Sequence, residues 1–141
     1  MNGFLYIKEV EKKGRGVFSS VPFAAGALIE ICPMLVFSVD DFDYIMSTFI
    51  INYCFFYNQK EGLAGLATGF GSLYNHSTPA NAFHKINKEE KSVSIFAVRD
   101  IAAHEEICIN YHGEYNSKST LWFTSRGIEC HSLPGESPPG L

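Results

Sequence analysis

Asn75-His76-Ser77, with Asn81 four residues further on, and His104-Glu105-Glu106-Ile107-Cys108-Ile109-Asn110-Tyr111 are the stretches that decide how this sequence is interpreted. A third stretch, Gly14-Arg15-Gly16-Val17-Phe18, lies near the N-terminus. Each has an ordinary explanation when taken alone. Most G-x-G sequences are turns, an Asn-His-Ser tripeptide is usually a polar turn, and a tyrosine at a strand end is usually a core residue. Their order and spacing within 141 residues make them informative.

From about Lys8 to Tyr115 the sequence resembles the SET-domain protein-lysine methyltransferases, in which the same three stretches occur in the same order. The resemblance implies a mainly β (β-rich α+β) fold: the SET fold of small curved sheets with one main helix and a C-terminal pseudoknot. In that pseudoknot the segment 104–113 passes beneath the loop that carries Asn75 and brings Tyr111 close to it. The implied activity is transfer of a methyl group from S-adenosylmethionine to a lysine.

Several positions depart from the usual family pattern. Thr78-Pro79-Ala80 stands where Cys-x-Pro is usual, Ser72-Leu73 replaces an Arg-Phe pair, and His104 replaces a glycine, which puts the local turn geometry in question. Gly69-Phe70-Gly71 looks most like the minimal viral members of the family. Those members lack a zinc-binding C-terminal module and pair as homodimers, so the resemblance raises a homodimer as one state of this chain.

Length and charge limit the classes of protein that fit. With 141 residues the chain is long enough for one domain and not two. We expect a single domain over residues 1–131 and a disordered tail over residues 132–141, which holds three of the six prolines. The net charge is −4 and no basic patch is evident, which argues against direct nucleic-acid binding. The acidic clusters are solvated surface or a surface that attracts a basic peptide.

The cysteines and the apolar runs give no sign of a metal, a leader or a membrane span. No two cysteines have C-x-x-C spacing, and Cys130 with His131 could not hold a structural zinc alone. Lys8 and Glu9 interrupt the apolar start, so no signal peptide is expected. The longest apolar run, 45–57, is shorter than the ~20 residues of a membrane span. The expected location is intracellular: nuclear, or host nuclear, if the substrate is a histone, and otherwise cytoplasmic.

The pattern of residue types predicts many short strands and one clear helix. The helix is expected over 40–57, with an acidic N-terminus, and 63–75 is expected to be irregular because of its glycines. A second helix could follow at 119–125. The expected strands are 4–10, 17–18, 27–31, 34–39, 82–86, 92–99 and 107–111, with a break at Pro33.

The resemblance assigns the cofactor-binding residues. Backbone groups of Gly14, Arg15 and Gly16 would meet the methionyl end of S-adenosylmethionine. The side-chain amide of Asn75 would grip its amino-acid end, since an amide offers both donors and an acceptor. Backbone groups of His76 would read the adenine edge, while the His76 ring is structural and not a general base.

The catalytic residue implied by the resemblance is Tyr111, whose hydroxyl would orient the attacking nitrogen or stabilise the transferring methyl group. Holding a lysine neutral at pH 7 costs about 4–5 kcal/mol, given its ordinary pKa of ~10.4. An aromatic channel and the sulfonium charge would lower that pKa. Tyr53, Ile109 and Tyr115 are the expected channel residues. Trp122 and Phe123 could complete the channel or simply pack a helix.

Ile109 is expected to influence how many methyl groups are added. It lacks a hydroxyl that could hold a water or the amine, and it leaves apolar space for a methylated nitrogen, so we expect dimethyl- or trimethyl-lysine. The alternative is that Ile109 is a core strand residue that faces away from the channel.

The expected function is methylation of a lysine in a basic protein or peptide, with a histone tail suggested by the family alone. The alternative is a catalytically silent SET-like module that binds a basic peptide. A cysteine-histidine hydrolase built on Cys54 or Cys108 lacks any flanking signature.

Overall fold

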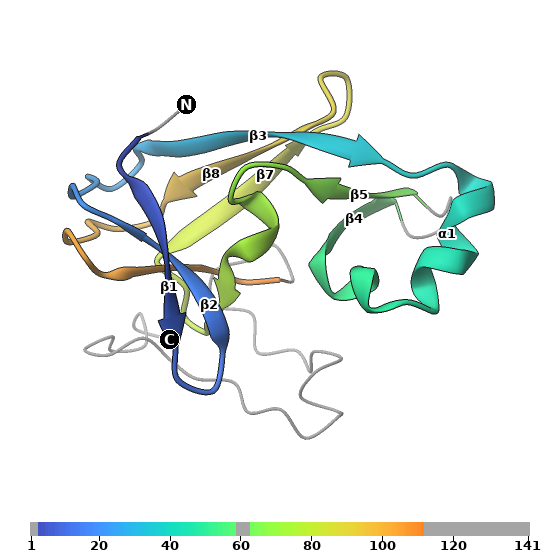
Figure 1. The fold of residues 1–141 in the computed structure, drawn as a ribbon. Helices are drawn as coiled ribbons and strands as arrows, with labels where there is room; N and C mark the ends of the chain where they lie inside the picture. The colour runs from blue at the N-terminus through green and yellow to red at the C-terminus, as the bar shows by residue number, and fades with distance from the viewer. Residues whose placement is uncertain (1–2, 59–62, 112–141) are drawn as a thin grey trace.

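The computed structural model describes residues 3–58 and 63–111, in which the chain forms two curled sheets with short helices beside them (Figure 1). The four-stranded sheet has the order β1 (Leu5–Val10), β2 (Gly14–Ser19), β9 (Glu106–Ile109), β6 (Asn75–His76). The five-stranded sheet has the order β4 (Cys54–Asn58), β5 (Leu63–Ala67), β3 (Leu28–Val36), β8 (Ser92–Ala97), β7 (Ala82–Asn87). The mainly β class with curved sheets is confirmed.

β9 provides the connection that the pseudoknot requires. It pairs antiparallel with β2, where Val17 lies opposite Ile107, and parallel with β6, where Asn75 lies opposite Cys108. Parallel neighbours need a crossover, which here runs through β7 and β8 in the other sheet. The segments that carry Asn75 and Tyr111 therefore lie side by side, as the resemblance implied.

Asn81 fixes the crossing of the 77–81 segment over β9. Its side chain is fully buried, and its amide nitrogen donates to the Glu106 carbonyl at 2.8 Å. Its amide oxygen accepts from the Cys108 backbone N–H, also at 2.8 Å. One buried side chain thus bonds two backbone groups of β9 and ties the 77–81 segment to that strand.

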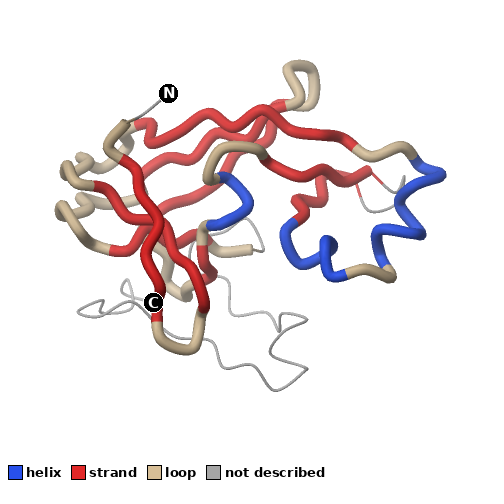
Figure 2. The backbone as a smooth tube through the Cα atoms, in the orientation of Figure 1, coloured by secondary structure: helices blue, strands red, loops and turns tan. Residues whose placement is uncertain are grey.

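The helical region is shorter than the sequence pattern predicted. The helix α1 ends at Met46 (Val39–Met46), and a 3₁₀ turn η1 (Phe49–Tyr53) and the strand β4 follow, so the predicted continuous helix over 40–57 is wrong (Figure 2). The hydroxyls of Ser47 and Thr48 donate to the carbonyls of Tyr44 and Ile45 and close the helix. The aromatic stretch after it pairs with β5 instead.

β3 is one strand, not two strands separated at Pro33. Pro33 lies opposite Ser92 of β8, and from Met34 onward β3 pairs with β5. A proline is tolerated where the strand changes partner because no ladder bond needs its missing N–H. The segment 63–75, expected to be irregular, contains β5, a 3₁₀ turn η3 (Gly71–Leu73) and β6.

His104, which stands where the family usually has a glycine, adopts a backbone conformation that favours glycine. Its φ is +64°, in the left-handed region that a glycine adopts most easily. The His104 ring nitrogen Nδ1 shares a hydrogen bond of 2.7 Å with the Tyr6 hydroxyl. The turn into β9 is therefore formed despite the substitution.

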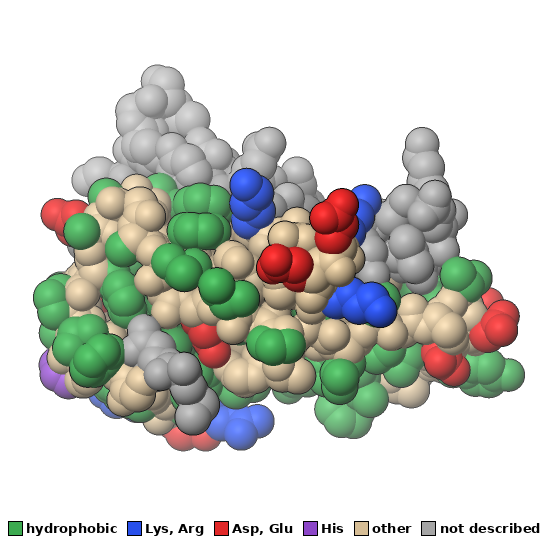
Figure 3. Space-filling model, turned by 90° about the horizontal axis from the view of Figure 1, so that it is seen from above, with side chains coloured by type: hydrophobic (Ala, Val, Ile, Leu, Met, Phe, Trp, Pro, Cys, Tyr) green, Lys and Arg blue, Asp and Glu red, His purple; other side chains and the backbone are tan. Residues whose placement is uncertain are grey.

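The core lies between the sheets and is made of aliphatic residues with Tyr74 among them. The fully buried members include Val17, Val93, Ile95, Ile101, Ile107 and Ile109. On the side of the molecule where β3 lies, apolar side chains are also spread over the surface between charged ones (Figure 3). Leu28, Ile31 and Leu35 of β3 are 46%, 56% and 60% exposed. Among the described residues, no helix is long and apolar enough to cross a membrane.

Candidate active site

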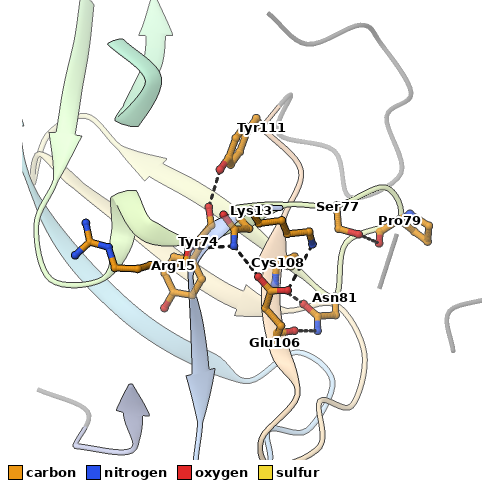
Figure 4. Close-up of polar contacts among 10 residues, drawn as sticks. Lys13, Arg15, Tyr74, Ser77, Pro79, Asn81, Glu106, Cys108 and Tyr111 are labelled. Atoms are coloured by element: carbon orange, nitrogen blue, oxygen red, sulfur yellow. Dashed lines mark hydrogen bonds and ion pairs between the residues drawn. The ribbon is translucent and has the colours of Figure 1, made fainter. Parts of the chain in front are cut away.

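Tyr111 follows β9, and both its hydroxyl and its backbone are held by the segment at β6. The hydroxyl donates to the Tyr74 carbonyl at 2.9 Å (Figure 4). The backbone N–H donates to Nδ1 of His76 at 3.1 Å, and the two rings lie 5.1 Å apart. Tyr111 is 38% exposed, so the residue lies at the surface of the domain.

The His76 ring braces the segment from both of its nitrogens. A backbone N–H can only donate, so Nδ1 of His76 is the acceptor and the ring proton lies on Nε2. Nε2 is 3.1 Å from the Thr78 hydroxyl. The ring is nearly buried, at 7% exposure. Both nitrogens are engaged in structural bonds, which is the arrangement of a brace and not of a general base.

A polar cluster lies at the other end of the same junction. Nδ2 of Asn75 donates to Oε1 of Glu106 at 2.7 Å and to the Arg15 carbonyl at 3.1 Å. Nζ of Lys13 lies 3.5 Å from Oε2 of Glu106, with the two side chains 12% and 10% exposed. The cluster therefore offers an amide, a carboxylate and an ammonium group in a partly water-excluded place.

The glycine turn shapes this cluster. Gly14 has a φ of +78°, which favours glycine. A Cβ atom on Gly16 would lie 2.6 Å from Oε1 of Glu106 and 3.1 Å from Nδ2 of Asn75. Any larger residue at 16 would displace these polar groups. Arg15 contributes its carbonyl, while its side chain points away from Glu106 (Figure 4).

Comparison with known proteins identifies this arrangement. Residues 14–112 match the SET domain. The chain belongs to the SET-domain family. It is 37% identical over 119 residues to a histone-lysine N-methyltransferase of Schizosaccharomyces pombe, described as specific for H3 lysine-37, which covers 84% of this chain and 76% of that protein. The expected enzyme class, a protein-lysine N-methyltransferase of the SET family, is confirmed.

Other matches extend this result. A candidate histone-lysine N-methyltransferase of Plasmodium falciparum is 41% identical over 64 residues, which are 41% of this chain and 1% of that protein. The crystal structure of a candidate histone methyltransferase of Plasmodium falciparum superposes with a TM-score of 0.65 and 26% identity, over 87% of this chain and 99% of that one. A Polycomb Repressive Complex 2 structure from Chaetomium thermophilum, with a TM-score of 0.63 and 22% identity over 76% of this chain and 14% of that one, shows the same fold.

The structure brings together Gly14, Arg15, Gly16, Asn75, His76 and Tyr111 from three separate parts of the SET sequence. Of the expected channel residues, Tyr53 and Ile109 lie within the described residues, and Ile109 pairs opposite His76 in the β6–β9 ladder. Tyr53 ends η1, is 40% exposed and meets Phe49 edge-on, with ring centroids 6.3 Å apart. Ile109 is fully buried in the core, which is what its alternative interpretation as a core strand residue predicts. Tyr115, Trp122 and Phe123 lie outside the described residues.

Sequence reasoning missed three residues that surround the SET motifs. The sequence predicts no role for Lys13, shows Glu106 only as part of the segment that ends at Tyr111, and shows Glu30 only as part of the strand 27–31. The sequence did contain an indication for Glu30, which interrupts the apolar run Leu28-Ile29-Glu30-Ile31. A carboxylate in such a run requires a hydrogen-bond donor if it is buried.

Burial and charge affect the pKa values of ionisable groups at the site and elsewhere among the described residues. Burial raises the pKa of the Tyr74 hydroxyl well above its ordinary range, and the Glu30 carboxylate adds to the rise. Burial also raises the pKa of the Cys54 thiol to about 11, so this thiol is not a ready nucleophile. Within residues 3–58 and 63–111, no three side chains of His, Cys, Asp or Glu gather as a metal site.

Proposed function

We propose that this SET-domain enzyme methylates a lysine in a basic segment of a histone, with S-adenosylmethionine as the methyl donor. The observation that carries the proposal is the Tyr111 hydroxyl, fixed on the Tyr74 carbonyl at 2.9 Å directly beside the Asn75–His76 strand. The Schizosaccharomyces pombe relative, named for its action on H3 lysine-37, supports the histone as substrate class.

The residues at the glycine turn fit the amino-acid end of the cofactor. That end carries an ammonium and a carboxylate. The carboxylate of Glu106, the amide of Asn75 and the ammonium of Lys13 are complementary to both charges. The space that a Cβ on Gly16 would fill lies against the same groups. S-adenosylmethionine, when bound, supplies a methyl group activated by a sulfonium charge.

The protein's own contribution is mainly to position the reactants. The Tyr111 hydroxyl donates its proton to the Tyr74 carbonyl, which orients its oxygen to accept from an amine N–H or to stabilise a developing charge. Removal of the lysine from water lowers its pKa and favours the neutral amine that attacks. No strong base is then required, and the His76 ring is already bonded at both nitrogens.

A basic substrate agrees with the charge of the chain. Its net charge is −4, and Asp40, Asp41 and Asp43 lie on or beside the exposed face of α1. Such a surface raises the local concentration of a lysine-rich peptide. A histone substrate would place the enzyme in a nucleus. A homodimer, suggested by the viral members of the family, remains a separate prediction.

The number of methyl groups added is a further part of this proposal and concerns Ile109, which is buried in the core but pairs opposite His76 in the β6–β9 ladder. We propose dimethyl- or trimethyl-lysine as the final product because no hydroxyl stands at this position. The test is Ile109→Tyr, with products resolved by mass over a long time course. A shift toward monomethyl-lysine supports the proposal. The same product distribution in the variant, or a wild type that stops at one methyl group, contradicts it.

The proposed function is tested by incubation with labelled S-adenosylmethionine and a panel of core histones and other basic proteins, with label located by mass spectrometry. Asn75→Ala should weaken cofactor binding in calorimetry by ~1–3 kcal/mol, because polar groups are left unpaired. Asn87→Ala is the matched control, since its side chain bonds only within the exposed β7–β8 turn among the described contacts. No transfer to any histone, or equal affinity in both variants, would overturn the proposal.

A further inference from the structure

Glu30 is an acidic residue in the middle of β3, and its side chain is on the same face as Cys32 and Met34. Side chains alternate along a strand, so these three share one side. The segment 69–71 presses against this side. A Cβ atom on Gly71 would lie 2.9 Å from Sγ of Cys32. The Gly69-Phe70-Gly71 sequence, which none of the assigned roles explains, is therefore the means by which the chain approaches β3.

The Glu30 carboxylate holds both ends of the segment that leads to β6. Oε2 accepts from the Phe70 backbone N–H at 3.1 Å. Oε1 accepts from the Tyr74 hydroxyl at 2.8 Å. Gly69 has a φ of +62°, and a Cβ atom there would lie 2.5 Å from Oε2, so a side chain at this position would strain the backbone and displace the carboxylate. One carboxylate thus spans residues 70–74 across the η3 turn.

Tyr74 connects this clamp to the reaction centre. Its ring is 1% exposed and ends on Glu30, while its carbonyl accepts from the Tyr111 hydroxyl. Because the ring is fixed at its far end, the position of the carbonyl is fixed as well. We propose that Glu30 is a positioning residue for methyl transfer, which acts through Tyr74 to place the Tyr111 hydroxyl.

This inference rests on the proposed function, because it concerns Tyr111, the residue proposed to catalyse methyl transfer. The electrostatics agree with the geometry. Burial raises the pKa of Tyr74, and the charge of Glu30 adds to that rise, so the phenol keeps its proton and remains the donor to the carboxylate. Burial likewise raises the pKa of the neighbouring Cys32 thiol, which stays uncharged.

Three single variants separate positioning from general stability. Glu30→Ala removes both contacts. Glu30→Gln keeps both, because the amide oxygen can accept from the Phe70 N–H while the amide nitrogen donates to a rotated Tyr74 hydroxyl. Asp100→Ala is the matched control: Asp100 also accepts from a backbone N–H, that of Ala25 at 2.8 Å, in a loop away from Tyr74.

We expect Glu30→Ala to lower kcat by about 100-fold, the loss that a displacement of about 1 Å can cause. KM values for cofactor and peptide should stay within about three-fold, because no group that touches either is removed. Glu30→Gln should restore kcat to within about three-fold of the wild type, and Asp100→Ala should leave it unchanged. If Glu30→Ala does not fold, Tyr74→Phe tests the same link, with a loss of about 10-fold in kcat and unchanged KM.

Hydrogen exchange of the Phe70 amide tests its bond to Glu30 without substrate or cofactor. The Phe70 amide should exchange faster in Glu30→Ala than in the wild type, Glu30→Gln or Asp100→Ala. A wild-type kcat in folded Glu30→Ala and Tyr74→Phe, an equal loss in Glu30→Gln, or an equal loss in the control would each overturn the inference. An inactive wild type would instead overturn the proposed function and the catalytic part of this inference. Unchanged exchange of the Phe70 amide in Glu30→Ala would show that Glu30 does not hold residues 70–74 in place.

Discussion

The junction of β2, β6 and β9 and the arm formed by α1 and η1 are built in opposite ways. At the junction, polar side chains are buried and bonded, including Ser77, Asn81 and Asn110 at 0%, 0% and 1% exposure. In the arm neither helix has a buried residue, and large apolar side chains such as Tyr44 and Phe49 are each 73% exposed.

The difference shows where this domain is rigid. A buried polar network requires each partner in place, because an unpaired group in a low-dielectric interior is costly. The junction is therefore held in one arrangement, which is what a site that positions reactants requires. The arm has little buried area to hold it and belongs to the less stable part of the structure. Substitutions should have large effects at the junction and small effects in the arm.

The largest effect is expected for Tyr111→Phe, which removes only the hydroxyl bonded to the Tyr74 carbonyl. Turnover should fall roughly 100- to 1,000-fold, the usual result of losing one preorganised polar group, and cofactor affinity should change little. Single-turnover methylation and calorimetry on one preparation would measure both. Tyr44→Phe, on the exposed arm, is the control. Full activity in folded Tyr111→Phe would remove this hydroxyl from the mechanism.

Asn81→Ala should be the most damaging change to stability at the junction. It removes the two hydrogen bonds to the Glu106 carbonyl and the Cys108 N–H, at a cost of about 2–3 kcal/mol. Denaturant unfolding would show this as a lower midpoint at a similar slope. The exposed Asn87 provides a comparison, because Asn87→Ala should change stability by less than about 0.5 kcal/mol. Equal losses in the two variants would contradict the role of Asn81.

His84 tests the contact between β7 and β4, the two outermost strands of the five-stranded sheet. Its ring meets Phe55 edge-on, with ring centroids 5.0 Å apart, and its Nδ1 is buried with no hydrogen-bond partner among the described residues. Burial lowers its pKa from 6.5 to about 4. Between these values the unfolded chain binds a proton that the folded protein does not, so folding stability falls as the pH drops from about 6.5 toward 4.

The loss assigned to His84 should be about 2 kcal/mol between pH 7.5 and 5. His84→Phe removes the titrating group while keeping an aromatic ring against Phe55, so its stability should change less over the same range. Urea unfolding of both proteins at the two pH values measures the difference. Parallel pH profiles in the wild type and the variant would show that His84 is not the group responsible.

The smallest effect is expected in the arm itself. Ser38 caps α1 by accepting from the Asp41 N–H at 3.1 Å. Ser38→Ala should speed hydrogen exchange of the α1 amides, because a lost cap costs about 1 kcal/mol of helix stability. Global stability should change by less than about 0.5 kcal/mol, since α1 buries no residue. A large global loss would show that the arm is more firmly integrated than its exposure indicates.

Local sequence was sufficient for the elements whose cause is local. The strand β1 and the β7–β8 hairpin follow from alternation of apolar residues around polar turns, and both were predicted close to their observed positions. The helix end and the continuity of β3 were not predicted. The end of the helix depends on hydrogen bonds from the Ser47 and Thr48 hydroxyls to backbone carbonyls. The continuity of β3 depends on its change of partner from β8 to β5 at Pro33.

The sequence by itself determined the family and the fold, because the glycine turn, Asn75-His76-Ser77 and the segment ending at Tyr111 keep their order and spacing. Only the tertiary structure decided the partners of these residues. The contacts of Asn75 with Glu106, Tyr111 with Tyr74, and Tyr74 with Glu30 join residues 31, 37 and 44 positions apart. Such contacts depend on the parallel register of β6 with β9 and on close approach to β3, and no local pattern of residue types encodes either.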